Sequence, residues 1–127
     1  MLKDRSTHTT LPCSDLERAK VFYSEKLGLA PESVQPGGVF FVGPDGSRFF
    51  LFQSGGAPSG SHTQMGWRVP DIHAEVAELK ARGVRFEEYD FPGFDRQTSV
   101  AQTGPVQSAW FKDSEGNLLG IVQLPAE

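Results

Sequence analysis

The chain has 127 residues, 38% of them hydrophobic with ten Phe, and a formal net charge of −4. This length and composition suit one globular domain with its own core, and the negative charge argues against binding nucleic acid or an anionic membrane. No run of 18 apolar residues predicts a membrane-spanning helix, and the N-terminus lacks a signal-peptide core, so a cytoplasmic protein is expected. The single cysteine, Cys13, has no obvious activating neighbour and is not expected to be catalytic.

The first elements lie in residues 9–29, "TTLPCSDLERAKVFYSEKLGL". A short strand precedes an amphipathic helix, in which Ser14 and Glu17 have capping-box spacing. Gly28 is placed to adopt the left-handed conformation that ends a helix. The apolar stripe expected to face the core consists of Leu16, Ala19, Phe22, Tyr23 and Leu27.

A hairpin is predicted over residues 37–53. The apolar stretches "GGVFFVG" and "SRFFLFQ" flank the turn "PDG", which is a strong hairpin signal. The following segment, "SGGAPSGSH" at 54–62, is rich in Gly, Pro and Ser and is typical of a linker.

Residues 65–84, "MGWRVPDIHAEVAELKARGV", repeat the design of residues 9–29. Asp71 is the predicted N-cap of a second helix, and Gly83 repeats the stop signal. The side chains expected to face inward are Ile72, Val76 and Leu79.

The segment between Glu88 and Val106 shows no sustained strand or helix pattern. A stretch of this length in a compact domain is usually a functional loop or disordered, and its aromatic residues favour a loop folded over something. Residues 89–105 are therefore predicted to form a movable cover. Beyond them, "SAWFKD" and "NLLGIVQ" flank "SEG" and predict a second hairpin.

The two halves together predict an α+β fold made of two βαβββ modules. Residues 1–127 form one domain, with a first module at about 6–53, a linker at 54–63 and a second module at 64–124.

The segments "HTTLPCSDLERAKVFYSEKLGL" and "AWFKDSEGNLLGIVQ" resemble the vicinal oxygen chelate superfamily, which includes glyoxalase I, bleomycin-resistance and fosfomycin-resistance proteins, and extradiol dioxygenases. The resemblance covers nearly the whole chain. It implies that the sheets of the two βαβββ modules curl into a half-open cup, often completed by a dimer partner.

Metal-dependent members of that superfamily place His and Glu ligands on the first and last strands of the modules. His8, seven residues before Asp15, matches the first ligand, and counting six residues back from Asp71 puts the second at Met65. The last-strand ligand falls at Gly120, and its counterpart in the first module at Phe50 or, if the sequence register slips, at Gln53. This donor set is too poor for the usual divalent metals, so no metal or other cofactor is expected.

Strand alternation predicts which side chains line the cup. Met65 and Trp67 are expected to share it with Gly120, which leaves space there, and Tyr89, Phe91 and Phe94 to close over it. The predicted ligand-binding residues are Thr10, Phe50, Met65, Trp67, Tyr89, Phe91, Phe94 and Gly120.

Three functions remain open from the sequence. The first is a homodimeric binding protein, similar to the bleomycin-resistance branch, that holds a small organic molecule without a metal. The second is a lyase, isomerase or dioxygenase-type enzyme that uses His8 as a general base, helped by Tyr89 or Asp90. The third is a dimeric domain that only presents a partner surface, because a fold does not fix a function. The alternative interpretation of Met65 and Trp67 is that they are simply core residues.

Overall fold

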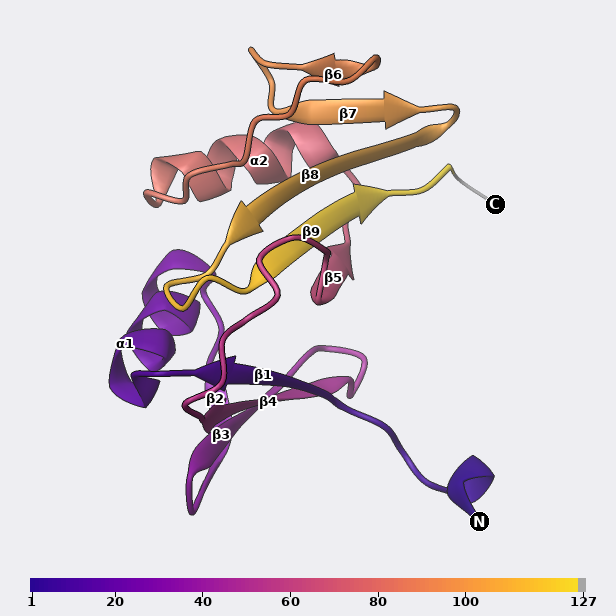
Figure 1. Ribbon diagram of the computed structural model, residues 1–127. Coiled ribbons are helices and arrows are strands. Elements are labelled where there is room, and N and C mark those ends of the chain that lie inside the picture. The colour runs from indigo at the N-terminus through magenta and orange to yellow at the C-terminus, as the bar shows by residue number, and fades with distance from the viewer. Residues whose placement is uncertain (126–127) are drawn as a thin grey trace.

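The structure is a computed structural model, and it describes residues 1–125 (Figure 1). Two modules follow each other along the chain, joined by a segment at 54–64 that carries no helix or strand. The elements in order are η1 (Leu2–Asp4), β1 (Thr9–Cys13), α1 (Leu16–Val21), η2 (Phe22–Lys26), β2 (Pro31–Gln35), β3 (Gly38–Val42), β4 (Arg48–Gln53), β5 (Met65–Arg68), α2 (Ile72–Ala81), β6 (Phe94–Asp95), β7 (Val100–Thr103), β8 (Val106–Lys112) and β9 (Leu118–Gln123).

The first module is a four-stranded sheet in the order β1-β4-β3-β2, covered on one face by α1. The first helix begins differently from the capping-box prediction. Asp15, not Ser14, is the N-cap, and its carboxylate accepts a hydrogen bond from the Arg18 amide at 3.1 Å. The helix then widens into the π-helical turn η2 and ends before Gly28, whose φ of 73° confirms the predicted stop.

The second module repeats this plan in a five-stranded sheet with the order β5-β9-β8-β7-β6. Asp71 caps α2 as predicted, accepting from the Ala74 amide at 3.2 Å, and the helix stops before Gly83. The predicted inward-facing residues of α2, which are Ile72, Val76 and Leu79, are all buried.

The prediction of an irregular cover at residues 89–105 is wrong in part. This segment contains β6 and β7, and β7 pairs antiparallel with β8 through Ala101 and Ser108. β7 has only four residues, two buried ones followed by two exposed ones, so it lacks the period-two alternation that marks a strand in a sequence. With β7 in place, β5-β9-β8-β7 matches β1-β4-β3-β2, so both modules are complete βαβββ units.

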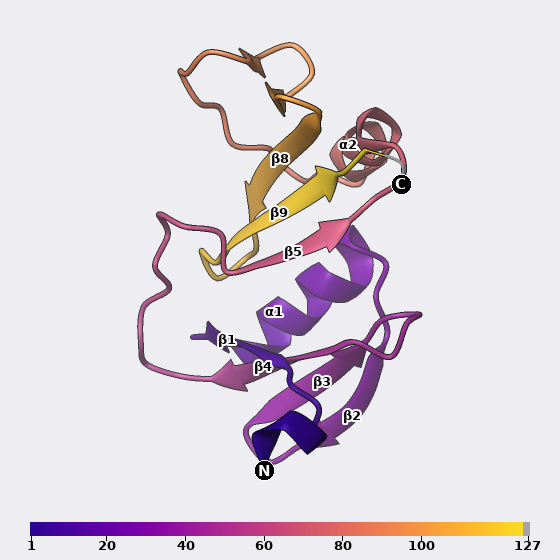
Figure 2. The same ribbon diagram turned by 90° about the vertical axis from the view of Figure 1, so that its right-hand side faces the viewer.

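The helix-covered faces of both sheets meet in one hydrophobic core. Figure 2 shows α1 lying between the first sheet below and strands β5 and β9 above. Aromatic rings cross the boundary between the modules, with Trp67 edge-on to Phe49 at 6.4 Å and stacked with Phe111 at the same distance. The modules therefore pack through their inner faces, and their outer faces point away from each other.

A buried polar turn also joins the modules. The Tyr23 hydroxyl of η2 donates to Asp113 Oδ2 at 2.7 Å, and the Asn117 amide nitrogen donates to the Pro12 carbonyl at 3.0 Å. Glu115 of the same turn accepts from the backbone amides of Ser14 and Asp15 at 3.1 and 3.0 Å. The β8–β9 turn thus docks on the start of the first helix.

The architecture is α+β, built from two mixed sheets with the expected repeat. No helix within residues 1–125 combines the length and the apolar composition that crossing a membrane requires.

Candidate functional site

The outer face of the first sheet carries a row of aromatic rings that α1 does not cover. Strand alternation puts Leu11 and Cys13 in the core and Thr10 on this face, where Thr10 pairs in register with Phe50. The rings lie close together: Phe40 is 4.5 Å from Phe50 between centroids, and His8 is 5.1 Å from Phe40. We call His8, Phe40, Phe50 and Phe52 the first aromatic face.

The outer face of the second sheet carries a similar group. Its centre is Trp110 of β8, which alternates with the buried Ala109 and Phe111. The Tyr89 ring meets Trp110 edge-on at 5.4 Å, and Phe91 lies 6.5 Å from it. We call Tyr89, Phe91, Phe94 and Trp110 the second aromatic face.

The predicted empty space at Gly120 is filled. Trp110 pairs with Gly120 across β8 and β9, and a Cβ at position 120 would lie 3.3 Å from Trp110 Cδ1 and from Thr63 Cγ2. The indole is held there by its Nε1–H, which donates to the Thr63 hydroxyl at 3.1 Å. Trp110 therefore occupies the room that a side chain on the last strand would need.

Met65 and Trp67 lie on the opposite face from the one predicted. In the β5–β9 ladder Gly66 faces Gly120, while Met65 pairs with Leu119 and Trp67 with Ile121, both of which are core residues. Met65 and Trp67 pack against the core with their pair partners. The error has a simple origin, because a shift of one residue along a strand exchanges its two faces.

The same one-residue shift moves the second candidate ligand position from Met65 to Gln64. Gln64 precedes Asp71 by seven residues, as His8 precedes Asp15, and each lies just before the first strand of its module. The four equivalent positions are therefore His8, Phe50, Gln64 and Gly120. One imidazole and one amide do not fit a divalent metal site that needs about three good donors. Within residues 1–125, no three His, Cys, Asp or Glu side chains gather in a way that could hold a metal ion.

The side-chain amide of Gln64 is incompletely hydrogen-bonded. Its side-chain Oε1 is buried and has no hydrogen-bond partner among the described residues. A buried acceptor without a donor is costly, and a water molecule or a ligand N–H or O–H group would satisfy it.

The residues suggested for acid–base chemistry are not brought together within one chain. His8 is exposed at the start of β1 and contacts Phe40, and no hydrogen bond in the described structure joins it to Tyr89 or Asp90. Burial raises the pKa of Tyr89, which makes its phenolate harder to form near neutral pH. Cys13 is 1% exposed and its thiol donates to the Phe52 carbonyl, and burial raises its pKa to about 11.

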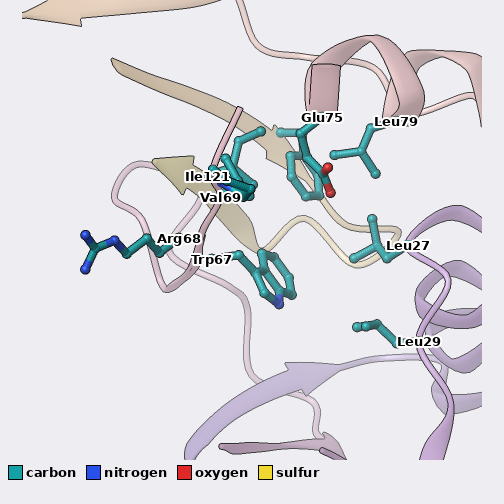
Figure 3. A pocket seen from close by; sticks show the side chains of 10 residues that line it. Leu27, Leu29, Trp67, Arg68, Val69, Glu75, Leu79 and Ile121 are labelled. Atoms are coloured by element: carbon teal, nitrogen blue, oxygen red, sulfur yellow. The ribbon is translucent and has the colours of Figure 1, made fainter. Parts of the chain in front are cut away.

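Two hollows open beside Trp67. One, of about 300 Å³, lies between the modules on their inner side and is shown in Figure 3. The other, of about 520 Å³, runs from β5 to the β3–β4 turn and includes Arg48 and Arg68. The predicted ligand-binding residue Trp67 thus lines solvent-reachable space, although not in the cup where it was expected.

Sequence reasoning missed several residues of the two outer faces. Phe40 and Phe52 lie on the same face of the first sheet as Phe50, and Trp110 lies on the same face of the second sheet as its pair partner Gly120. The alternation of side chains along the strands was enough to place all three residues on these faces. Gln64 was not identified because the ligand position was counted six residues before Asp71, at Met65, and not seven. Only the occupation of the Gly120 site by Trp110 needed the three-dimensional structure.

The chain was compared with known proteins. The model of the Glyoxalase/Bleomycin resistance protein/Dioxygenase superfamily matches residues 5–121. A search of curated protein sequences found no match.

Solved structures with the same fold have low sequence identity. UcmS2 superposes with a TM-score of 0.73 at 20% identity, over 93% of this chain and 96% of that one. A glyoxalase/bleomycin resistance protein/dioxygenase from Nocardioides gives 0.68 at 24% identity, over 97% and 87%. A lactoylglutathione lyase from Agrobacterium tumefaciens gives 0.63 at 22% identity, over 94% and 92%. These likenesses concern the fold. The match of the family model over nearly the whole chain, together with the two βαβββ modules, shows that this protein belongs to the glyoxalase/bleomycin resistance protein/dioxygenase superfamily.

Proposed function

We propose that the protein is a homodimer that binds a small planar or amphipathic organic molecule between two aromatic faces, without a divalent metal. The observation that carries this proposal is the pair of aromatic faces, one on the outer side of each sheet, which point away from each other within one chain.

The partial exposure of these rings supports an interface. Phe40, Phe50, Phe52 and Trp110 are only half-buried, and Phe91 is 39% exposed. Clustered exposed aromatic side chains on a soluble domain mark a surface that binds something. A row of rings spaced for stacking suits a flat ligand better than an aliphatic one.

The open strand edges support a second copy as the other wall. Among the described strands, β1 and β5 each have a hydrogen-bonded neighbour on one side only. Each open edge borders one aromatic face. Pairing β1 of one subunit with β5 of another would place a first aromatic face beside a second one and make two equivalent cups by two-fold symmetry.

The polar groups near the faces suit orientation of a ligand. Gln64 Oε1 lacks a donor among the described residues. The exposed His8 lies beside Phe40, and the exposed Thr10 pairs with Phe50. A ligand N–H or O–H group reaching Gln64 would remove the cost of that unpaired acceptor.

The test reads Trp110 directly. In a Trp67→Phe variant Trp110 is the remaining tryptophan, and planar aromatic compounds are expected to change its fluorescence at one molecule per subunit. Phe50→Ala should lower the binding free energy of every such compound by about 0.5–1.5 kcal/mol or more, the usual contribution of one aromatic pair. Val34→Ala, an exposed residue of the same sheet, is the matched control. If no compound class changes the Trp110 signal, the proposal is wrong.

A lyase, isomerase or dioxygenase-type activity with His8 as general base is the second candidate. It is favoured by the exposed imidazole on the first aromatic face and by the fold shared with a lactoylglutathione lyase. Turnover that depends on His8 and survives dialysis against a chelator would favour it over simple binding.

A further inference from the structure

We propose that the 300 Å³ hollow between the modules is a second binding site, for a small amphipathic ammonium whose charge pairs with Glu75 and whose apolar part packs on Trp67. This site is separate from the two aromatic faces and does not depend on the function proposed above.

The hollow has walls from both modules. Leu27 and Leu29 enter it from the segment after η2, and Leu79 of α2 enters it from the other side (Figure 3). Phe111 of β8 also lines it. Its volume is at the lower end of the range for small-molecule pockets, so a ligand with one ring or a short alkyl chain is the right size.

Glu75 is the polar group that sets the ligand's charge. Figure 3 shows its carboxylate among the apolar side chains, beside Leu79 and above Leu27. Glu75 is half-buried, and within residues 1–125 its carboxylate has neither an ion-pair partner nor a side-chain hydrogen bond. A half-buried carboxylate that faces an apolar hollow without a partner favours a cation as the occupant.

The other charged residue of the lining does not compete for Glu75. Arg68 is exposed, and in Figure 3 its guanidinium extends away from the other lining side chains.

Trp67 is the second element of recognition. Its indole borders the hollow from β5, stacked at 6.4 Å on Phe111. An indole face attracts organic cations through its π system, and the flat ring packs an apolar body well. A primary ammonium on an aromatic or alkyl body satisfies both Trp67 and Glu75, whereas a carboxylic acid or a sugar satisfies neither.

The probe is 2-phenylethylammonium, with 2-phenylethanol as its neutral match and 3-phenylpropanoate as its anionic match. The wild-type protein has two tryptophans, so its ¹⁵N spectrum contains two indole N–H signals, which Trp110→Phe assigns. The ammonium should shift the Trp67 signal and leave the Trp110 signal in place. It should bind about tenfold more tightly than the alcohol, the effect expected of one charged hydrogen bond, and the acid should bind weakest.

The variant Glu75→Gln should remove this preference, lowering ammonium affinity about tenfold while leaving alcohol affinity unchanged. Glu78→Gln is the matched control, because Glu78 lies on the same helix, outside the hollow, 3.6 Å from Arg82. Leu27→Phe should narrow the hollow and lower the affinity of the protein for all three compounds.

Three results would overturn the proposal. The alcohol could bind as tightly as the ammonium, Glu75→Gln could leave the preference intact, or none of the three compounds could move the Trp67 signal. A shift of Trp110 alone would assign the compounds to the second aromatic face, and that too would overturn the proposal.

Discussion

The hydroxyl of Tyr23 in the first module donates a 2.7 Å hydrogen bond to the buried carboxylate of Asp113 in the second. Asp113 also accepts from the backbone amides of Glu115 and Asn117, so one carboxylate organises the β8–β9 turn and attaches it to η2. This contact joins the two modules in addition to the hydrophobic core that they share.

Tyr23→Phe is therefore expected to lower the free energy of unfolding by about 1–3 kcal/mol, because it removes a buried hydrogen bond to a charged group. Urea denaturation measures the change. Tyr89→Phe is the control, since the Tyr89 hydroxyl makes no hydrogen bond among the described residues. Equal stability of Tyr23→Phe and the wild type would contradict this account of the module boundary.

Acid should loosen the same boundary through Glu115. The Arg18 guanidinium, whose Nε donates to Glu115 at 2.8 Å, lowers the pKa of Glu115 from its ordinary value of 4.5 to about 2. Because the pKa is lower in the folded state, ionised Glu115 stabilises the fold above pH 4.5, and this contribution is lost as the pH falls from 4.5 to about 2.

Glu115→Gln should thus be less stable than the wild type at pH 7 and should lose less stability between pH 4.5 and 2. Denaturant titrations at several pH values test this, with Glu78→Gln as an exposed control. Parallel stability curves for Glu115→Gln and the wild type would exclude the proposed role of the Arg18 pair.

Cys13 should resist alkylation while the protein is folded. Its side chain is buried and its pKa is about 11, so little thiolate is exposed at pH 8. Mass spectrometry after iodoacetamide treatment should show an unmodified native protein and a fully modified protein in denaturant. Rapid modification of the native protein would show that β1 opens locally.

The assembly prediction concerns Phe50. A homodimer built on the aromatic faces should dissociate when a charge is placed among the rings, so Phe50→Lys is expected to be monomeric at micromolar concentration. Sedimentation equilibrium reports the mass, and Val34→Lys, at a residue 70% exposed on β2, is the control. A monomeric wild type, or a dimer that Phe50→Lys leaves intact, would remove the basis for a shared cup.

The purified protein is expected to hold no stoichiometric nickel, zinc, iron or manganese, because His8 and Gln64 are the only possible donors among the four equivalent positions. Elemental analysis after mild dialysis gives the metal content. Near-stoichiometric metal that is lost in His8→Ala would contradict the expectation.

Local signals in the sequence were enough for most of the fold. The Asp71 cap, the stop glycines and the two hairpins carry helix and turn chemistry that acts within a few residues. The strand β7 was not predicted because its four residues lack the alternation of buried and exposed side chains that marks a strand. The faces of β5 were predicted wrongly because a shift of one residue along a strand exchanges its two faces. The six-residue count contained such a shift, so Met65 and Trp67 were assigned to the cup, whereas they lie on the core face.

The site was predicted less completely for a related physical reason. The sequence showed that Gly120 has no side chain, and the absence was interpreted as space. Space at a glycine depends on its cross-strand neighbour, and here that neighbour is the largest side chain available.

The pairing of Trp110 with Gly120 makes the side chains tolerated at positions 110 and 120 depend on each other. A side chain introduced at position 120 alone would require the indole or Thr63 to shift, because the new Cβ would lie 3.3 Å from an atom of each. Removing Trp110 alone would take away the ring on which Tyr89 and Phe91 pack and break its bond to Thr63. Both single changes disturb this packing, so the residues at positions 110 and 120 are predicted to vary together in any library selected for folding.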